Sequence, residues 1–546
     1  MVAALVYPIY LAIESSHTIS LKIMKILSIA YITTKTKQQP VLTMLVLAVT
    51  LLTFQGTLAQ NIQARIIDRA TKENIPYANI QVSALEHLVS NEEGYFNLSE
   101  GNSKDEIVIT ISYLGYFSQQ LTINQLKKLD FVVALQPSIF ELNDVKVSNV
   151  KPNPYEIMAQ VKANLNTNHK NDVLPSKDFI FYRKSGLFKP AVIEVEINES
   201  TGFSKHALKK VNSDVQKFIS KLISSPPKDF TDILGNYYNS TIKKDDKYVP
   251  VTKLEVLKAT ILENEGSSTS ADELKKLAIN TILQHLDSTK YYRAKSGLFG
   301  SRDTISLRKD FNKKKTKNKN TSTQILATKN NLNTFLTENN LLNTSSFNFI
   351  YNPEWYEYQY EGLSYMDGTE AAYVLTFKPK KSKAKYIGKL YISDSDYGVL
   401  RVTYDLDAGE KLNNVNLKLI LGIKAADNKR KGTLMYRKKI HGKGYYLQYA
   451  NIEKGQYFYV NRPLKFIELT SEEKDIFSLD IKIEGNTSSK MEYLNMSHTI
   501  ITPSELQKVT EADFKFTKIK SYDPKIWKDY NAIEPLSEMK RFKTME

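Results

Sequence analysis

The chain of 546 residues contains no cysteine. This absence excludes disulfides, thiolate metal sites, a thiol nucleophile and the lipid-modified cysteine of a bacterial lipoprotein. Tryptophan is scarce as well: the chain has two tryptophans and 33 tyrosines. Tyrosine is enriched in β-strands, so this composition favours a protein rich in strands. At this length the chain is long enough for two or more domains with substantial cores.

Catalytic sequence motifs are also missing. The chain has no His-Glu-x-x-His, no Gly-x-Ser-x-Gly and no glycine-rich phosphate loop followed by Lys-Ser/Thr. Its histidines are scattered, and no two are paired at metal-ligand spacing. They are His17, His87, His169, His206, His285, His441 and His498. We therefore expect a protein that is not an enzyme and that holds no metal and no cofactor.

The formal charge is +16, so contact with anionic lipid, acidic polysaccharide or nucleic acid is electrostatically easy. No nucleic-acid recognition motif accompanies this charge, so a solvated lysine-rich surface is the favoured interpretation and nucleic acid is not expected as a partner. Peripheral contact with a membrane stays open. The basic polar run within residues 309–324 predicts a mobile loop.

The N-terminal part contains one long apolar run, Val41–Phe54, which is too short to cross a bilayer comfortably. Small residues follow it and end at Ala59. This pattern predicts a leader and signal peptide over residues 1–59 and therefore an exported protein. An uncleaved membrane anchor is the alternative, and Met24 and Met44 are alternative translation starts.

Residues 60–137 contain short runs in which apolar and polar residues alternate, separated by turns of Gly, Asn, Pro and charged residues. Such runs are typical of antiparallel strands with one buried face. Their short, regular spacing predicts a seven-stranded β-sandwich. Gly94 follows an acidic turn, where a residue free to take a positive φ redirects the chain.

The order of these pieces resembles the carboxypeptidase-regulatory-like domain, a transthyretin-like sandwich. The residues that carry the resemblance are, in order, Asp68; Pro76, Ala78 and Ile80; Glu93, Gly94 and Phe96; Gly115 and Tyr116. The chain departs from the pattern at Ala64, where the family usually has glycine. The resemblance implies a non-catalytic module, so peptidase activity does not follow from it. It also implies an envelope protein of a Gram-negative bacterium, in the periplasm, at the outer membrane or on the cell surface.

Residues 138–154 read as a linker, because Pro152 and Pro154 interrupt regular structure. Within it, Phe140–Val147 resembles the segment that joins the same module to the plug of TonB-dependent outer-membrane transporters. No series of barrel strands of transporter length follows. This resemblance implies an alternative function, namely an accessory protein that handles glycans or peptides beside such a transporter.

Residues 155–500 predict a larger antiparallel half-barrel, mainly β within an α+β class. It begins with an amphipathic helix over Tyr155–Leu165, and strands are expected next over Asp178–Arg183 and Val192–Ile197. A helical insertion is expected at about 204–290, with helices from His206 to before Pro226, over Lys253–Leu262 and over Ala271–Leu286. Alternating strands follow over Trp355–Tyr360, Ala372–Phe377, Tyr386–Ile392, Val399–Tyr404, Val415–Ile420, Thr433–Ile440 and Tyr445–Ile452. Residues 501–546 form a C-terminal tail.

A meander that curls around a helix resembles the half-barrel of periplasmic lipoprotein and lipid carriers, and the hairpin Ile387–Val402 carries that resemblance. Aromatic strand residues are candidates for a ligand wall, although ordinary core and cross-strand pairing is the favoured interpretation. The candidates are Trp355, Tyr358, Tyr446, Tyr449, Tyr457 and Tyr459. We expect the sandwich to be a module that docks another protein or stabilises the fold. The half-barrel is expected to hold an apolar ligand or a partner, and a lipid and a glycan are both possible ligands.

A hydrolase built on Glu354, Glu357 or Asp396 is the least favoured hypothesis. Glu357 and Glu361 are four residues apart on a predicted strand, which is roughly 13 Å by strand rise and too far for paired acid-base chemistry. Asp396 lies in an Asp-x-Asp-x-Gly sequence that lacks the later ligands of a calcium loop, so a hairpin turn explains it better.

Overall fold

The computed structural model describes residues 62–542 apart from 84–85, 100–101, 103, 139–150, 171–173, 202–203, 227, 245–246, 263–289, 297–298, 307–322, 367–369, 441, 470–475, 528 and 531. The predicted signal peptide, the transporter-like segment Phe140–Val147, the helix over Ala271–Leu286 and most of the basic loop lie outside these residues. Within them, no helix combines the length and the hydropathy needed to cross a membrane.

The N-terminal domain is the predicted seven-stranded sandwich. One sheet has three strands, β1 (Ile62–Asp68), β4 (Tyr95–Leu98) and β7 (Val132–Leu135). The other has four, β2 (Asn79–Gln81), β3 (His87–Val89), β5 (Val108–Ser112) and β6 (Gln119–Thr122). A short helix, α3 (Ile123–Lys128), precedes β7. Gly94 has a φ of +77°, and a Cβ there would lie 2.8 Å from the Ile66 carbonyl oxygen, so the turn requires glycine.

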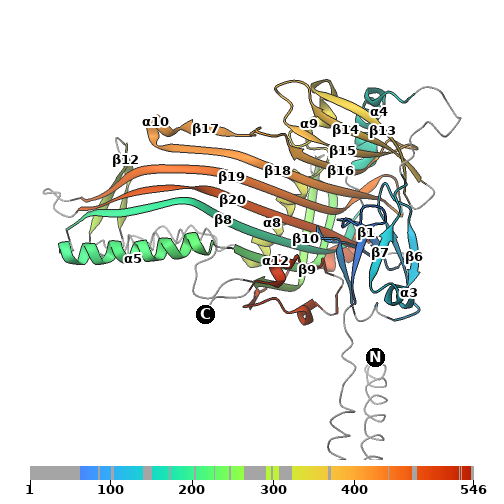
Figure 1. Ribbon diagram of the computed structural model, residues 1–546, viewed down its shortest axis with the longest axis horizontal. Helices are drawn as coiled ribbons and strands as arrows, with labels where there is room; N and C mark the ends of the chain where they lie inside the picture. The colour runs from blue at the N-terminus through green and yellow to red at the C-terminus, as the bar shows by residue number, and fades with distance from the viewer. Residues whose placement is uncertain are drawn as a thin grey trace, which may run out of the picture. The chain divides into compact units, whose positions relative to one another are not determined.

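The rest of the chain is built on one sheet of 14 strands (Figure 1). Its path runs β13 (Tyr356–Met366), β14 (Glu370–Pro379), β15 (Tyr386–Ser393), β16 (Val399–Leu406), β18 (Ile423–Lys438), β19 (Tyr445–Glu468), β20 (Ile476–Ile500), β8 (Ser176–Ser200), β9 (Lys228–Lys244), β10 (Lys247–Leu262) and β21 (Thr517–Ile519). Off this path lie β11 (Tyr291–Ser296), β12 (Phe299–Ser306) and β17 (Asn414–Leu417). The prediction of a mainly β half-barrel is confirmed, and its strand pairs are antiparallel except for β10 with β21.

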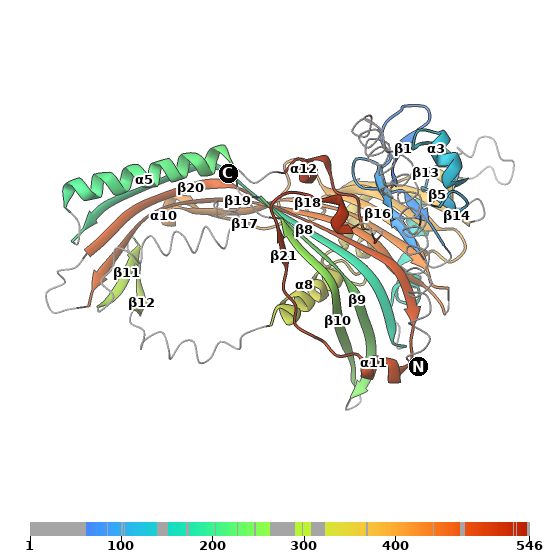
Figure 2. The same cartoon turned by 90° about the horizontal axis from the view of Figure 1, so that it is seen from below.

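Helices cover one face of this sheet. They are α4 (Pro154–His169), α8 (Gln324–Glu338), α9 (Asn348–Tyr351) and the 3-10 turn η2 (Pro353–Trp355). Figure 2 shows α8 lying in the curve formed by β8, β9 and β10. Apolar residues of α4 and α8, among them Val161 and Phe335, share one core cluster with Tyr182 of β8 and Tyr493 of β20. Burial of this shared surface holds the helices in the curve.

The sandwich and the C-terminal segment pack against the sheet through a different cluster, which joins Tyr77 of the sandwich, Tyr449 of β19 and Trp527. The C-terminal segment contains α11 (Pro503–Lys508), β21, the 3-10 turn η3 (Pro524–Trp527) and α12 (Ser537–Lys540). Asn91 of the sandwich donates from Nδ2 to the Glu534 carbonyl oxygen at 3.2 Å. The end of the chain therefore ties the two domains together.

Four strands, β18, β19, β20 and β8, continue beyond their shorter neighbours, and we call this continuation the arm. β9 pairs with β8 only as far as Leu187. Beyond that point α5 (Lys205–Ser224) runs along β8 (Figures 1 and 2). The Asn212 side chain bonds both the amide N–H and the carbonyl of Ile197, each at 2.9 Å, and Gln216 Nε2 donates to the Val195 carbonyl at 3.1 Å. Side chains of α5 thus form hydrogen bonds with backbone groups on the edge of β8 that β9 leaves unpaired.

The structure corrects several predicted elements. Lys253–Leu262 is part of strand β10 and not a helix. A register shift between Val256 and Lys258 leaves Leu257 as an extra residue, so that Leu254, Leu257 and Ile261 acquire a spacing that mimics a helix. Only the first part of the expected insertion is helical among the described residues, and β9 and β10 follow it.

Two further corrections concern strand ends. The strands expected over Asp178–Arg183 and Val192–Ile197 are one continuous strand of 25 residues, β8. The strand expected over Val415–Ile420 stops at Leu417 and gives way to a helical turn, α10 (Lys418–Leu421). The sequence did not predict α8.

Candidate functional site

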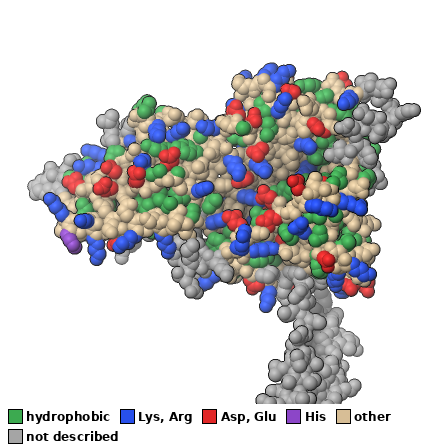
Figure 3. Space-filling view, viewed as in Figure 1, with side chains coloured by type: hydrophobic (Ala, Val, Ile, Leu, Met, Phe, Trp, Pro, Cys, Tyr) green, Lys and Arg blue, Asp and Glu red, His purple; other side chains and the backbone are tan. Residues whose placement is uncertain are grey.

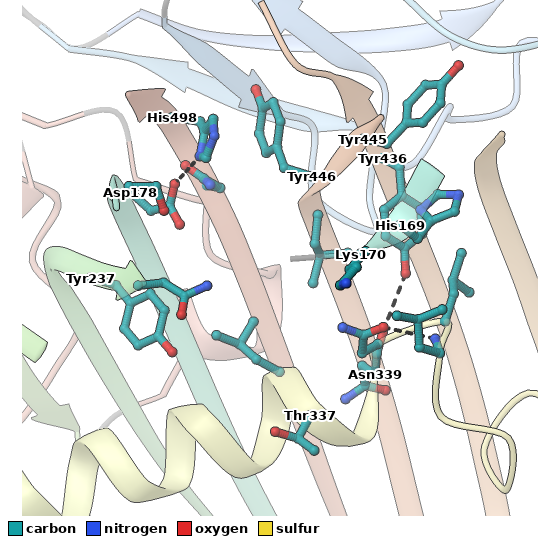
Figure 4. A pocket seen from close by; sticks show the side chains of 18 of the residues that line it. His169, Lys170, Asp178, Tyr237, Thr337, Asn339, Tyr436, Tyr445, Tyr446 and His498 are labelled. Atoms are coloured by element: carbon teal, nitrogen blue, oxygen red, sulfur yellow. Dashed lines mark hydrogen bonds and ion pairs between the residues drawn. The ribbon is translucent and has the colours of Figure 1, made fainter. Parts of the chain in front are cut away.

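A cavity of about 570 Å³ lies between α8 and the sheet (Figure 4). Its wall comes from the C-terminal end of α4, the first residues of β8, the middle of β9 and β10, the last turn of α8 with the loop over residues 339–343, and β18, β19 and β20. This volume lies within the range of small-molecule sites. The last turns of α8 and the loop after it thus form the side of the cavity that faces the sheet.

One wall is formed by His498, Asp178 and Tyr446. His498 of β20 and Asp178 of β8 are directly paired across the two strands, and Nδ1 of the histidine lies 2.5 Å from Oδ1 of the aspartate. The imidazole proton between the two residues is therefore assigned to Nδ1, and Nε2 of the same ring has no hydrogen-bond partner among the described residues. The ring of Tyr446 stacks on the imidazole with centroids 4.6 Å apart, and burial raises the pKa of Tyr446 to about 12. Its hydroxyl is neutral at physiological pH.

The opposite wall contains His169, the last residue of α4. Its Nε2 accepts the Val399 amide N–H at 3.1 Å, and its ring lies edge-on to Tyr436 with centroids 4.8 Å apart. Burial lowers the pKa of His169 to about 3, although nearby Asp396 acts in the opposite direction. The ring is thus neutral, and because Nε2 accepts, the proton is assigned to Nδ1 as a donor.

A hydrogen-bonded row of polar side chains connects α8 to the sheet. Tyr237 of β9 donates its hydroxyl proton to Asn333 Oδ1 at 2.9 Å, and Asn333 Nδ2 donates to Thr252 Oγ1 of β10 at 2.9 Å. Burial raises the pKa of Tyr237 above its ordinary value. These bonds fix the height of α8 above β9 and β10, and so they fix the width of the cavity.

Four polar atoms on side chains that line the cavity have no hydrogen-bond partner among the described residues. They are Nδ1 of His169, Oδ1 of Asn339, Oδ1 of Asn495 and Nε2 of His498. Only eleven such buried side-chain atoms occur in the described part of the chain, so this one site holds more than a third of them. Native proteins leave few buried polar atoms unsatisfied, because each costs about 1–3 kcal/mol.

The predicted aromatic candidates do not come together in one place. Tyr446 lines the cavity, and the other five do not. Tyr358 is buried in the main core with Trp355 packed against it. Tyr449 lies in the cluster beneath the sandwich.

Tyr457 and Tyr459 lie on β19 in the arm, where each ring faces a lysine. Lys424 Nζ lies 5.4 Å from the Tyr457 centroid, and Lys418 Nζ lies 4.1 Å from that of Tyr459. These two tyrosines therefore belong to a surface that the cavity does not share.

The three carboxylates considered for hydrolysis do not converge. Glu357 forms an ion pair with Lys378 at 3.3 Å on the outer side of the sheet. Asp396 accepts the Gly398 amide N–H at 2.9 Å and the Tyr445 hydroxyl at 3.0 Å, as a turn residue does. Among the described residues, no group of His, Asp and Glu side chains could hold a metal ion.

The sequence did not identify the polar residues of the cavity. Asp178 and His498 are 320 residues apart, and only the register of β8 on β20 brings them together. His169 follows directly from the predicted amphipathic helix, so extending that helix by one turn was the one available signal.

Comparison with known families bears on the N-terminal domain, whose three-stranded and four-stranded sheets enclose a single core. Residues 62–147 match the CarboxypepD_reg-like domain. The predicted family of this module is therefore confirmed, and the CarboxypepD_reg-like domain is a non-catalytic module of the binding or regulatory type. No curated protein and no solved structure is a significant match to the chain.

Proposed function

We propose that the protein is a non-enzymatic binding protein whose half-barrel cavity takes a small, hydroxyl-rich molecule such as a mono- or disaccharide. The four unpartnered polar atoms around one cavity carry this proposal. His169 offers a donor at Nδ1, Asn339 and Asn495 offer amide oxygens, and His498 offers its ring nitrogen Nε2. A hydroxyl group both donates and accepts, so it matches every member of this set after small side-chain rotations.

The aromatic wall supports the same ligand class. Tyr446 presents a ring held in place by the His498 stack, and aromatic faces bind the C–H faces of sugars while the hydroxyls reach polar groups. A purely apolar ligand, which is one of the alternatives that the sequence left open, would leave all four polar atoms unsatisfied. We therefore propose a polar ligand in place of the apolar one.

We also propose that the chain is exported and works in the envelope of a Gram-negative bacterium. The apolar run before Ala59 supports export, and the transporter-like sequence of Phe140–Val147 supports a Gram-negative envelope. An alternative proposal is an accessory protein beside a TonB-dependent transporter, supported by the sequence of Phe140–Val147. Cross-linking in cells followed by purification of the chain would recover a transporter under the alternative and none under the first proposal.

The test of the ligand proposal is native mass spectrometry of the chain purified gently from an envelope fraction, followed by thermal melting with a panel of mono- and disaccharides. We expect either a retained mass of a small glycan or a rise in melting temperature with at least one sugar. A retained lipid that is lost on organic extraction would overturn the polar ligand and restore the apolar one. A bare mass and no shift with any sugar would contradict ligand binding in this cavity.

Asn495→Val sharpens the test, because valine is larger than asparagine by only about one methylene group, is tolerated in a strand and has no polar group. If Asn495 serves a polar ligand, this variant should lose the ligand and yet be as stable as wild type or more stable, since it removes a buried atom with no partner. A stabilised variant that keeps its affinity would show that Asn495 takes no part in binding.

A further inference from the structure

One edge of the arm carries a hairpin whose tip is unusually apolar and exposed. Strands β17 and β18 pair from Asn414–Ala426 to Leu417–Ile423, and α10 forms the turn between them. All ten residues from Lys411 to Ile420 are exposed. Leu419 is 100% exposed and Ile420 is 81% exposed, which makes them the two most exposed large apolar side chains of the described residues. We call residues 411–424 the hairpin tip.

Hydrogen bonds around Gly422 fix the conformation of the hairpin tip, so that Leu419 and Ile420 point outward. Gly422 has a φ of +63°, donates its N–H to the Lys418 carbonyl at 3.1 Å and accepts the Asn461 N–H at 2.8 Å. A Cβ at Gly422 would lie 2.0 Å from the Asn461 carbonyl oxygen, so the close approach to β19 requires glycine. The turn is therefore anchored to β19, and Leu419 and Ile420 cannot fold back onto the sheet without breaking these bonds.

Further apolar side chains stand beside the turn on the same hairpin. Val415 is 52% exposed and Leu417 is 38% exposed, and the two alternate with asparagines on β17 so that they share one face. A contiguous exposed apolar group of this kind is rare on a protein that meets only water, and it marks a surface that meets a partner or a membrane.

The charge around this apolar group has one sign. Residues 411–424 contain three lysines, Lys411, Lys418 and Lys424, and no aspartate or glutamate. Acidic groups on either side are engaged: Glu410 pairs with Lys385 at 2.5 Å, and Asp427 accepts from Asn413 Nδ2 at 2.6 Å. Figure 3 shows hydrophobic and basic side chains side by side along the upper edge of the arm, over β17 and α10.

We propose that the hairpin tip inserts into the surface of a bilayer that contains anionic lipid. Leu419 and Ile420 would enter the boundary between headgroups and acyl chains, and the three lysines would meet the phosphates. The complementarity of charge favours this occupant over a second copy of the chain, which is itself strongly basic at +16. This surface is separate from the cavity and does not depend on the ligand proposed for it.

The test is flotation of the full chain with vesicles of phosphatidylcholine alone and of phosphatidylcholine with about one quarter phosphatidylglycerol. We expect binding to the anionic vesicles, weakened by salt, and little binding to the neutral ones. The double variant Leu419→Ser/Ile420→Ser should lower the partition coefficient by about tenfold or more, because it removes the inserted apolar groups. The triple variant Lys411→Gln/Lys418→Gln/Lys424→Gln should lower it on anionic vesicles only.

The matched control is Val108→Ser/Ile440→Ser, which removes two side chains that are 50% and 61% exposed elsewhere on the chain. This control should bind vesicles as wild type does, and so should Tyr446→Ala in the cavity. Leu419 and Ile420 are free of core contacts, so an unchanged melting temperature of the tip variant verifies its fold. Binding that the tip variant retains, equal binding to neutral vesicles, or no binding by wild type would each overturn the proposal.

Discussion

The ring of Tyr77 in the sandwich stacks on the ring of Tyr449 in β19, with centroids 5.3 Å apart and planes inclined at 30°. The Tyr77 hydroxyl oxygen accepts from Asn451 Nδ2 at 2.7 Å, and Asn79 Oδ1 accepts from Gln448 Nε2 at 2.8 Å. Both tyrosines are buried. The CarboxypepD_reg-like domain is thus joined to the half-barrel by contacts of the kind found inside a domain core.

Tyr77→Ala is expected to lower the free energy of unfolding by about 3–5 kcal/mol, because it removes a buried aromatic ring and leaves the Asn451 amide without its acceptor. Urea unfolding followed by tyrosine and tryptophan fluorescence measures this loss. Val108→Ala, at a half-exposed position of the same sandwich, should change stability by no more than about 0.5 kcal/mol. Equal effects of the two variants would contradict a core-like junction.

The buried ion pair of Arg183 and Asp232 gives a second prediction. Its two bonds measure 2.7 and 2.8 Å, and Arg183 Nη1 also donates to the Ile533 carbonyl at 3.1 Å. Asp232→Asn leaves a buried cation uncompensated and should cost about 3–5 kcal/mol. The exposed pair of Lys482 and Glu194 is the control, and Glu194→Gln should cost less than about 1 kcal/mol in the same chemical denaturation assay.

Stability should depend on pH through His169. Burial holds the pKa of this histidine at about 3 in the folded chain, against 6.5 for the ordinary side chain, while Asp396 favours and Lys439 opposes its protonation. Between these two values the unfolded chain binds the proton and the folded chain does not, so stability falls as the pH is lowered from 6.5 toward 3, by about 1.4 kcal/mol per pH unit. Thermal or urea unfolding of wild type and His169→Gln at pH 7, 5.5 and 4.5 measures the difference. The variant should show the shallower dependence, and identical slopes would contradict this assignment.

A fourth prediction separates the cavity from the arm with two tyrosines of β19. Tyr446→Ala should weaken binding of the sugar found in the melting assay by roughly tenfold, about 1.4 kcal/mol, because it removes the stacking wall. Tyr457→Ala should leave the affinity unchanged, since this ring lies in the arm beside Lys424. Isothermal calorimetry gives both values. A loss of affinity in the Tyr457 variant would place the ligand elsewhere.

The sandwich could be predicted from the sequence because its strands are short, strictly alternating and separated by turn residues, as at Gly94. The long strands could not be delimited in the same way. Gly186 and Pro190 interrupt the pattern of β8, yet the strand continues through them. Pro190 lies beyond the last residue of β8 that pairs with β9, at an edge where a missing N–H is tolerated. Glycine and proline in the sequence therefore predicted two separate strands, whereas pairing with β20 continues β8 through both positions.

The cavity was beyond prediction for another physical reason. Its polar residues come from α4, the loop after α8, and β20, and none of them lies in a motif. Their grouping follows from the register of β20 on β8, a pairing between segments some 300 residues apart that periodicity does not encode. Of the aromatic residues, alternation identified Tyr446 as a strand residue, but it could not say which face of the sheet would stay open.

The helix α5 has a consequence for how these molecules behave in concentrated solution. A long strand with unpaired N–H and C=O groups is a template on which the strand of a neighbouring molecule can add. Asn212 and Gln216 occupy those groups on β8 at Ile197 and Val195. The backbone groups of β8 at these positions are therefore not free to pair with a strand of another molecule. In this way α5 opposes polymerisation of the chain through the β8 edge of the arm.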